Sequence, residues 1–354
     1  MAKKLAGLGV ALVLLAQLEP AAGGVKFGEE DLKSDESLWN LYERWGVRYN
    51  VARDPAEKLR RFAVFKDTVR RVHLRAAAGV SPGLNGFADI TANEFTRDFS
   101  CRMTRRNLTA PPPVKRRADR TLSLPLSVDW RSKTCKSGQP CLGPVRSQGA
   151  TCGSCWAFAA TGALEIHQAI KGENNREPLQ LSVQELIDCD PDSNGCDGGF
   201  AESAFVYVSR KGISSAAAYP YTAAADGICQ ASSTPRVDLL MRGYQTVPPN
   251  DELQLLRAVT NGPVVISIAV GDNNKEFQDY QGGLYHGEGK ECGTDNDHEM
   301  LLVGYGVDYY IIKNSYGERW GDHGYMLLKR DFGKSPDGTC GILKEGGYYP
   351  EIGL

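Results

Sequence analysis

The strongest constraint on this chain is a cysteine at the start of a long apolar stretch. Cys152-Gly-Ser-Cys155-Trp-Ala-Phe158 opens a mostly apolar run that continues to Ile170, which predicts a central helix over residues 154–171. A thiol in the first turn of a helix lies at the positive end of the helix dipole, which favours the thiolate. Because a thiolate is the nucleophile of cysteine hydrolases, the pattern indicates a reactive Cys155.

Two residues far downstream complete this pattern. His298 lies 143 residues after Cys155 and begins a β-rich run, whereas the other four histidines lie in an N-terminal helix, deep in the central helix or in glycine-rich loops. Asn314 lies 159 residues after Cys155, in Lys313-Asn-Ser-Tyr-Gly317. With the motif around Cys155, these residues resemble the papain family of cysteine proteases, and the likeness runs from about residue 35 to the end.

The resemblance implies a fold and a domain order. The fold would be α+β, with a helical left domain at about 124–232, a β-barrel-like right domain at about 233–354 and a cleft between them. A helical prodomain would precede this peptidase domain of 124–354. The pattern of the sequence agrees, because helical periodicity before Cys229 gives way to short β-rich runs beyond Arg236. No metal and no organic cofactor is expected.

The first 24 residues read as a signal peptide. Lys3 and Lys4 precede an apolar run over 5–18, and small residues follow it up to Gly24. A membrane anchor is the alternative, but the apolar run is too short to span a bilayer. We therefore expect the secretory pathway, with a lysosome, a vacuole or the extracellular space as destination, and no membrane span.

Secretion changes the meaning of the ten cysteines, because an oxidising compartment favours disulfides. By the resemblance, three pairs match the family: Cys152–Cys196, Cys189–Cys229 and Cys292–Cys340. Cys135 and Cys141 bracket a short turn and are expected to bridge locally. Cys101 and Cys155 would then remain unpaired. A zinc site is the alternative, but the cysteines are scattered and no Cys-x-x-Cys pair has a matching second pair.

Residues 25–123 read as an inhibitory propeptide. Residues 35–49 and 56–76 have the spacing of amphipathic helices. Glu57-x3-Arg61-Phe62-x2-Phe65 and Gly83-x-Asn85-x-Phe87-x-Asp89 resemble the two propeptide motifs of the family, although Thr68 and Ala76 replace two usual asparagines. A Thr/Pro/Arg-rich linker over 104–121 follows, and Asn107-Leu-Thr109 within it is a glycosylation acceptor.

Charge differs between the two parts. Residues 24–124 hold 20 Lys+Arg and 13 Asp+Glu, net +7, and residues 125–354 hold 19 and 29, net −10. This difference favours an electrostatic clasp between propeptide and enzyme, with two independently solvated surfaces as the alternative. We expect acid to weaken the clasp by protonating carboxylates, with Asp89 as a candidate trigger, so that self-processing occurs near pH 4–5.

The resemblance assigns roles at the site. Cys155 would be the nucleophile, His298 the base and Asn314 the acceptor that fixes the imidazole. Gln148 would supply the oxyanion hole together with the Cys155 N–H. Gln148 lies seven residues before Cys155, one more than usual, so the loop must bulge. Tyr316 stands where the family has tryptophan and would shield the His–Asn hydrogen bond less completely.

The resemblance also indicates how substrate binds. Gly198 and Gly199 would pair with the substrate backbone as an added strand. The pocket for the second residue before the cut would be formed by Phe200, Ala201, Ser267, Glu299 and Glu345, and Tyr316 and Trp320 would also be substrate-binding residues. Two carboxylates in that pocket favour Arg or Lys as well as Leu or Phe, and the alternative is that Glu345 turns to solvent. Between Cys196 and Tyr221 the chain has no room for the large loop that turns some members of the family into exopeptidases. The resemblance therefore favours an endopeptidase.

The expected partners are protein or peptide substrates, the chain's own propeptide and protein inhibitors of the cystatin type, and the expected state is a monomer. A catalytically silent papain-fold binding or storage protein is the alternative function. A nucleic-acid partner is disfavoured, because the propeptide's aromatic residues lie on the apolar helix face and not between the basic ones.

Overall fold

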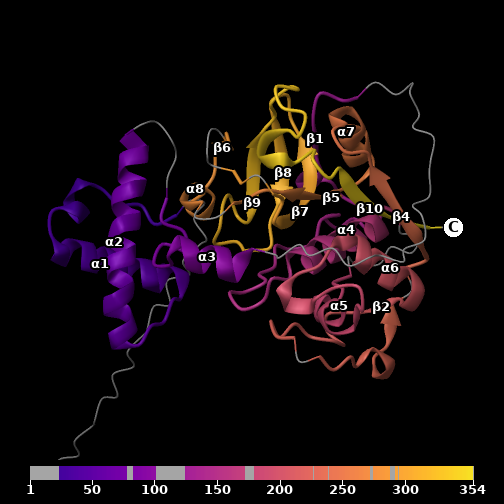
Figure 1. Cartoon of the computed structure of the whole chain (residues 1–354), viewed down its shortest axis with the longest axis horizontal. Coiled ribbons are helices and arrows are strands. Elements are labelled where there is room, and N and C mark those ends of the chain that lie inside the picture. Colours follow the sequence, from indigo (N-terminus) through magenta and orange to yellow (C-terminus); the bar gives the residue numbers. More distant parts are fainter. Residues whose placement is uncertain are drawn as a thin grey trace, which may run out of the picture.

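The structure is a computed structural model of the chain, and it describes residues 24–77, 83–100, 124–171, 179–225, 227–237, 239–271, 274–287, 292–293 and 295–353. The expected signal peptide (apart from Gly24), Cys101, Asn107 and the linker over 104–121 lie outside the described residues. An N-terminal helical lobe lies beside a larger body built from a helical and a strand-rich half (Figure 1).

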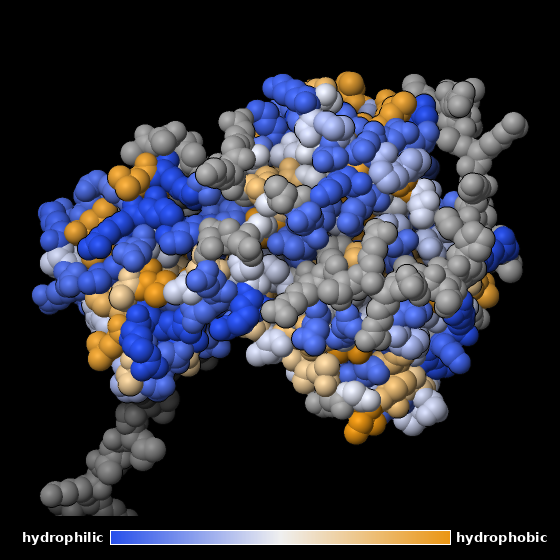
Figure 2. Space-filling model, in the orientation of Figure 1, coloured by the Kyte–Doolittle hydropathy of each residue, from blue (hydrophilic) through white to orange (hydrophobic). Residues whose placement is uncertain are grey.

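The lobe is formed by α1 (Asp35–Tyr49) and α2 (Pro55–Ala77), both predicted from their periodicity. Ser34 caps α1 by accepting the Ser37 N–H, and Trp45 packs against Phe65 with ring centroids 5.4 Å apart. A short η1 (Glu29–Leu32) precedes α1. The outward face of the lobe is mostly hydrophilic, with separate hydrophobic spots (Figure 2), as expected for helices that bury one face only.

The third helix of the lobe, α3 (Ala92–Phe99), was not predicted because its apolar pattern covers only two turns. Thr91 and Glu94 form a reciprocal capping box at its start. The helix lies between the lobe and the rest of the molecule (Figure 1). Its aromatic residues Phe95 and Phe99 belong to the core of the larger body and not to that of the lobe.

The helical half is arranged around α4 (Cys155–Lys171), whose first thirteen residues are all buried. Helix α4 contacts α5 (Val183–Cys189) and α6 (Ala201–Lys211) on one side and β7 and β10 on the other. Ser182 caps α5 in one direction only, because the Glu185 carboxylate turns to the Ser214 N–H and the Tyr207 hydroxyl. The smaller elements of this half are η2 (Trp130–Ser132), η3 (Gly195–Asp197), β2 (Ile213–Ser214), η4 (Ala231–Ser233) and β3 (Arg236–Val237).

The strand-rich half is one sheet in the order β4-β10-β5-β7-β8-β9-β6, with β1 (Val128–Asp129) paired to β7. No pairing among the described residues joins β4 to β6, so the sheet stays open and is not a closed barrel. The α+β class is confirmed. The strands are β4 (Met241–Val247), β5 (Val264–Ile268), β6 (Leu284–Tyr285), β7 (His298–Tyr305), β8 (Tyr309–Lys313), β9 (Tyr325–Lys329) and β10 (Gly347–Ile352), with α7 (Glu252–Asn261), α8 (Lys275–Gln278) and η5 (Thr339–Gly341) beside them.

Four disulfides link the chain at the expected pairs: Cys135–Cys141, Cys152–Cys196, Cys189–Cys229 and Cys292–Cys340. Cys155 is also disulfide-bonded, and none of the cysteines that the structure describes is a free thiol. The expectation that Cys155 stays unpaired is therefore wrong for this form of the protein.

Candidate active site

Cys155 begins α4 and is completely buried. The backbone N–H of Glu299 points at its sulfur, with a distance of 3.4 Å between N and Sγ. Since Glu299 follows His298 directly, this contact brings the start of α4 in the helical half against the start of β7 in the strand-rich half. His298, 143 residues after Cys155 in the sequence, therefore directly precedes the residue whose N–H contacts the Cys155 sulfur, at the junction of the two halves.

His298 and Asn314 are brought together by the pairing of β7 with β8. The His298 Nε2 lies 2.8 Å from the Asn314 Oδ1, which also accepts the Ser315 N–H. Because Oδ1 only accepts, Nε2 must carry the proton, and Nδ1 is left as the ring atom available for chemistry. Burial lowers the pKa of His298 to about 4, against a smaller opposite effect of the Asn314 hydrogen bond, so the imidazole is neutral in this covered form.

Gln148 reaches the same place despite the extra residue before Cys155. Gly149 adopts a φ of +72°, and Ala150 and Thr151 are exposed, so the additional residue bulges into solvent. The Thr151 hydroxyl fixes the bulge by donating to the Ala223 carbonyl. The loop therefore absorbs the insertion without displacing the Gln148 side chain.

The orientation of Gln148 is set by Ser315. The Ser315 hydroxyl donates to the Gln148 Oε1 at 2.7 Å, and the Gln148 backbone N–H donates to the Ser315 carbonyl. This leaves the amide nitrogen as a donor toward the site, where it donates to the carbonyl of Cys152 at 3.1 Å and to that of Phe99 at 3.4 Å. Ser315 was not predicted from the sequence, although its position directly after Asn314 was a signal that could have found it.

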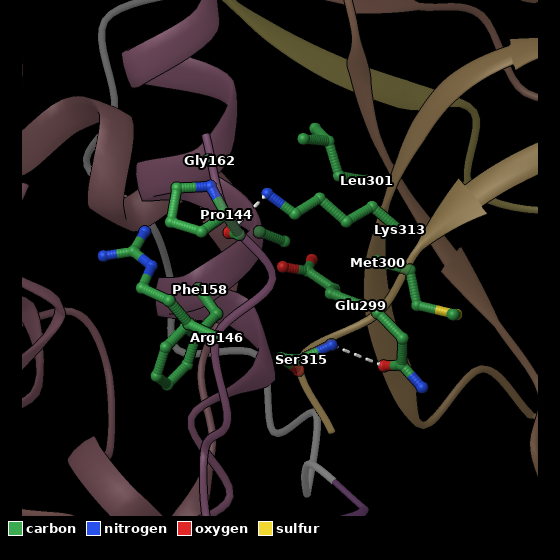
Figure 3. A pocket seen from close by; sticks show the side chains of 11 residues that line it. Pro144, Arg146, Phe158, Gly162, Glu299, Met300, Leu301, Lys313 and Ser315 are labelled. Atoms are coloured by element: carbon green, nitrogen blue, oxygen red, sulfur yellow. Dashed lines mark hydrogen bonds between the residues drawn. The ribbon is translucent and has the colours of Figure 1, made fainter. Parts of the chain in front are cut away.

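A small pocket behind the site shows how the segment carrying Gln148 is held (Figure 3). Lys313 extends from β8 across this pocket and donates to the carbonyls of Gly143 and Pro144. Burial lowers the pKa of Lys313 to about 8. Arg146 pairs with the buried Glu165 of α4 at 2.9 Å. Lys313 of the strand-rich half and Glu165 of the helical half thus hold the segment that leads to Gln148.

Tyr316 takes the place predicted for it, over the imidazole. Its ring centroid lies 4.9 Å from that of His298, and Trp320 packs edge-on against it at 5.6 Å. Trp320 is itself fixed because its indole N–H donates to the Phe277 carbonyl. The Tyr316 hydroxyl lies 3.5 Å from the His298 Nδ1. Burial keeps the pKa of Tyr316 well above its ordinary value, so the hydroxyl stays protonated.

Residues 83–100 cover this site. Asn85 donates from its side chain to the Gln278 carbonyl, and Gln278 returns hydrogen bonds to the carbonyls of Phe87 and Ile90. The Phe99 carbonyl accepts hydrogen bonds from the Tyr316 hydroxyl at 3.0 Å and from Gln148. The Phe99 carbonyl of the N-terminal segment therefore lies between the Tyr316 hydroxyl and the Gln148 side-chain amide.

Charged pairs fasten the lobe at a second place. Arg71 of α2 binds Asp279 with Nε 2.8 Å from Oδ2, and the Thr68 hydroxyl accepts from the same guanidinium. Arg75 pairs with Glu276. Thr68, which replaces an expected asparagine, thus orients a cation that crosses the interface. These pairs join the basic and acidic parts of the chain, and their partners were not predicted individually.

Asp89, the candidate acid trigger, makes its side-chain contacts inside the lobe. Its buried carboxylate accepts from the Tyr42 hydroxyl and from two nitrogens of Arg53, all within the lobe. Arg61 binds the neighbouring carbonyl of Asp89 and the Glu94 carboxylate. Desolvation raises the pKa of Glu94, but the hydrogen bonds from Arg61 and Thr91 outweigh it and bring the value to about 2. These carboxylates hold the lobe and α3 in shape.

The predicted substrate strip is buried in this form. Gly199 cannot carry a side chain, because a Cβ there would lie 2.8 Å from the Trp156 ring. Phe200, beside it, is buried and precedes α6. Gly198 has a φ of 122°, which also favours glycine, so both positions exclude a larger residue.

The predicted pocket carboxylates behave differently from each other. Glu299 is buried, lies opposite Ser267 in the β5–β7 pairing, and accepts the N–H of Ala201 at the start of α6 at 2.9 Å. Its carboxylate thus ties β7 to a helix N-terminus, a favourable place for a negative charge. Glu345 is half-buried, with one enclosed carboxylate oxygen that has no hydrogen bond. It lies just before β10, whose Gly347 pairs with Ile266.

Within the described ranges no group of three or more His, Cys, Asp or Glu is placed to hold a metal ion. No helix in the same ranges is both long and apolar enough to cross a bilayer.

Comparisons with known proteins agree with this geometry. The family model described as "Papain family cysteine protease" matches residues 124–349. The chain is 42% identical over 353 residues to the cysteine endopeptidase Rep1 of Oryza sativa subsp. japonica, covering 96% of this chain and 90% of the relative. It is 39% identical to vignain of Phaseolus vulgaris, covering 91% of this chain and 88% of the relative.

Solved proforms share the whole architecture. The proform of the ragweed pollen cysteine protease Amb a 11 superposes with a TM-score of 0.75 at 33% identity, covering 93% of this chain and 97% of that one. Recombinant stem bromelain precursor gives a TM-score of 0.76 at 33% identity, covering 90% of this chain and 99% of that one. The N-terminal lobe therefore resembles the corresponding part of known precursors.

Proposed function

Because this chain belongs to the papain family of cysteine proteases, we propose that its endopeptidase is made as a zymogen, inhibited by residues 25–123 and activated by their removal. The observation that carries the proposal is the Phe99 carbonyl, held by Gln148 and Tyr316 beside His298. A segment of the chain's own backbone occupies the place of a substrate there. The mature enzyme would begin near residue 124, and a signal peptide over 1–24 would direct it to the secretory pathway.

The mechanism follows from the residues around the sulfur. Once it is free of its disulfide, Cys155 would attack the substrate carbonyl as a thiolate, with His298 as imidazolium at Nδ1. The amide nitrogen of Gln148 and the Cys155 N–H would stabilise the oxyanion. His298 would then protonate the leaving amine, and water would hydrolyse the thioester with His298 as base. Asn314 would hold the ring in the productive tautomer.

Two conditions must change before this chemistry starts. The disulfide at Cys155 must be reduced by an added thiol: its thiolate attacks one sulfur to form a mixed disulfide and releases the other sulfur as thiolate, and a second thiol then cleaves the mixed disulfide. The propeptide must also leave, because its cover keeps His298 buried and neutral. Solvent access would raise the pKa of His298 toward its ordinary value and permit the ion pair.

The activity of the purified full chain tests this proposal. After incubation at pH 4–5 with a reductant, it should lose its propeptide and cleave a peptide substrate, and Cys155→Ala should abolish the cleavage. A Cys155→Ala chain that still matures when incubated alone would refute self-processing. A wild-type chain that matures but cleaves no peptide would favour the catalytically silent alternative.

A further inference from the structure

The loop from Gln148 to Cys152, which holds the additional residue, lies against a distant segment of the helical half. The Thr151 hydroxyl donates to the Ala223 carbonyl at 3.0 Å, and a Cβ at Gly149 would lie 3.8 Å from the Ala223 Cβ. Ala223 itself has a φ of +57°. An alanine keeps such a conformation only where the surrounding structure holds it there. The bulged loop therefore rests on a constrained residue of the peptidase part.

Two residues before Ala223, the Tyr221 hydroxyl joins the two chain segments that carry the proposed oxyanion donors. It lies 2.6 Å from the Gln148 carbonyl and 2.9 Å from the Ser154 hydroxyl. Burial raises the pKa of Tyr221 to about 12, so the hydroxyl keeps its proton and donates it to the carbonyl, which can only accept. The Ser154 hydroxyl must then donate to the Tyr221 oxygen. Gln148 holds the side-chain donor, and Ser154 directly precedes Cys155, whose N–H is the other donor.

The segment around Tyr221 is held by two helices of the same half. The ring of Phe158, from α4, packs edge-on against that of Tyr221 with centroids 5.0 Å apart. The Gln184 side chain, from α5, accepts the Thr222 N–H at 2.9 Å and donates to the Ala224 carbonyl at 2.6 Å. These contacts give the Tyr221 hydroxyl a fixed position from which it can hold a longer loop.

We propose that Tyr221 is a positioning residue for the oxyanion hole, because its hydroxyl keeps the Gln148 amide and the Cys155 N–H at their working separation despite the additional residue. This inference rests on the proposed function and deepens it. A longer loop has more conformations to lose when it is ordered. Both donors must lie about 2.7–3.1 Å from one oxygen of the transition state. Loss of the Tyr221 hydroxyl should therefore lower kcat and change KM little.

Double-mutant kinetics separate positioning from a general structural effect. Each full-length variant is processed by an aspartic protease in acid, reduced, and assayed on an internally quenched peptide near neutral pH, with turnover normalised to the Cys155 thiol that iodoacetamide labels. We expect Tyr221→Phe to lower kcat by about 3- to 10-fold, the range for one neutral hydrogen bond. In a Gln148→Ala background the same substitution should lower kcat by less than about twofold, because no amide remains to be positioned. Tyr310→Phe, which removes a buried hydroxyl bonded to Glu252, is the matched control and should change kcat in neither background.

Thr151→Ala tests the same support from the exposed side of the loop. It removes the hydrogen bond to Ala223 without opening the core, so the variant is expected to fold. We expect kcat to fall by about threefold when Gln148 is present, the lower end of the range for one hydrogen bond. In the Gln148→Ala background kcat should not change.

The outcomes are distinguishable. Equal factors for Tyr221→Phe in the two backgrounds, or a loss confined to KM, would overturn the positioning role while leaving the protease intact. If the melting temperature shows that Tyr221→Phe does not fold, Thr151→Ala decides, and full kcat in that variant overturns the inference. Absence of wild-type turnover after processing and reduction would overturn the proposed function and this inference with it.

Discussion

The pair between Arg71 and Asp279 gives the sharpest test of how the propeptide is held. Asp279 is 4% exposed, and the Arg71 Nε and a second guanidinium nitrogen lie 2.8 and 2.7 Å from its Oδ2. Burial raises the pKa of Asp279, and the charge of Arg71 is the largest opposing influence. Arg71→Ala therefore leaves a buried carboxylate with only the more distant Arg75 and Lys275 to offset it.

The size of the effect follows from this burial. Removing one partner of a buried ion pair costs about 3–5 kcal/mol. Because the Arg71 side chain is 20% exposed, we expect a smaller loss of about 2 kcal/mol in the free energy of propeptide closure, equivalent to about a 30-fold larger open population. The loss in the free energy of propeptide closure should be smaller in acid. An unpartnered Asp279 takes up a proton more readily, so the penalty is fully present at neutral pH and declines as the carboxyl is protonated.

Proteolysis of the open form measures this population. In a Cys155→Ala background, which prevents self-cleavage, a trace of mature enzyme removes the propeptide at a rate set by the open fraction. We expect Arg71→Ala to be processed about 30-fold faster than its parent at pH 7, and by a smaller factor at pH 5. Arg70→Ala is the matched control, because Arg70 is 62% exposed and pairs only within α2 at 3.8 Å. Rates for the two variants within twofold of each other at pH 7 would refute the clasp.

Four further outcomes are expected. The intact zymogen should resist iodoacetamide labelling at Cys155 until a reductant is added, and mass spectrometry of the tryptic peptide would contradict this if label appeared without reductant. Ser315→Ala should lower kcat about tenfold by freeing Gln148, with KM little changed in steady-state assays, since lost oxyanion donors typically cost about 10²–10³. His167, whose pKa burial lowers to about 4, is protonated more readily when unfolded, so stability falls as pH drops from 6.5 toward 4; His167→Gln should flatten the melting temperature over that range. Glu345→Gln should reduce cleavage after an Arg at the second position before the cut relative to Phe, and an unchanged ratio in a peptide library would exclude Glu345 as the specificity group.

Much of the lobe could be predicted because its signals are local. Helices α1 and α2 are long and strongly periodic, and apolar residues of their inner faces, such as Leu41 and Phe65, lie in the core. Helix α3 was missed because eight residues give too little periodicity to separate a helix from a loop. Its burial also depends on aromatic partners such as Tyr316 that lie more than 200 residues away.

The candidate active site also combines features that could be predicted from the sequence with features that could not. The approach of Cys155, His298 and Asn314 to one another was predicted by family resemblance, since no local pattern encodes contacts across two halves. The disulfide state of Cys155 was not predictable, because pairing depends on which thiols meet in space. The anchoring of Glu299 on the start of α6 was equally hidden, because the residues it joins are 98 positions apart. Because the Glu299 carboxylate is already bonded to the start of α6, Glu345 is the better candidate for a residue that selects Arg or Lys in the substrate.

The aromatic contacts around α3 have a consequence for the mature enzyme. Phe87, Phe95 and Phe99 cover Tyr316 edge-on in this form of the protein. In the activation proposed above, all three would leave with the propeptide and expose the Tyr316 ring to water, which is unfavourable for an apolar surface. A bulky hydrophobic side chain of another polypeptide would then lower the free energy by covering that ring.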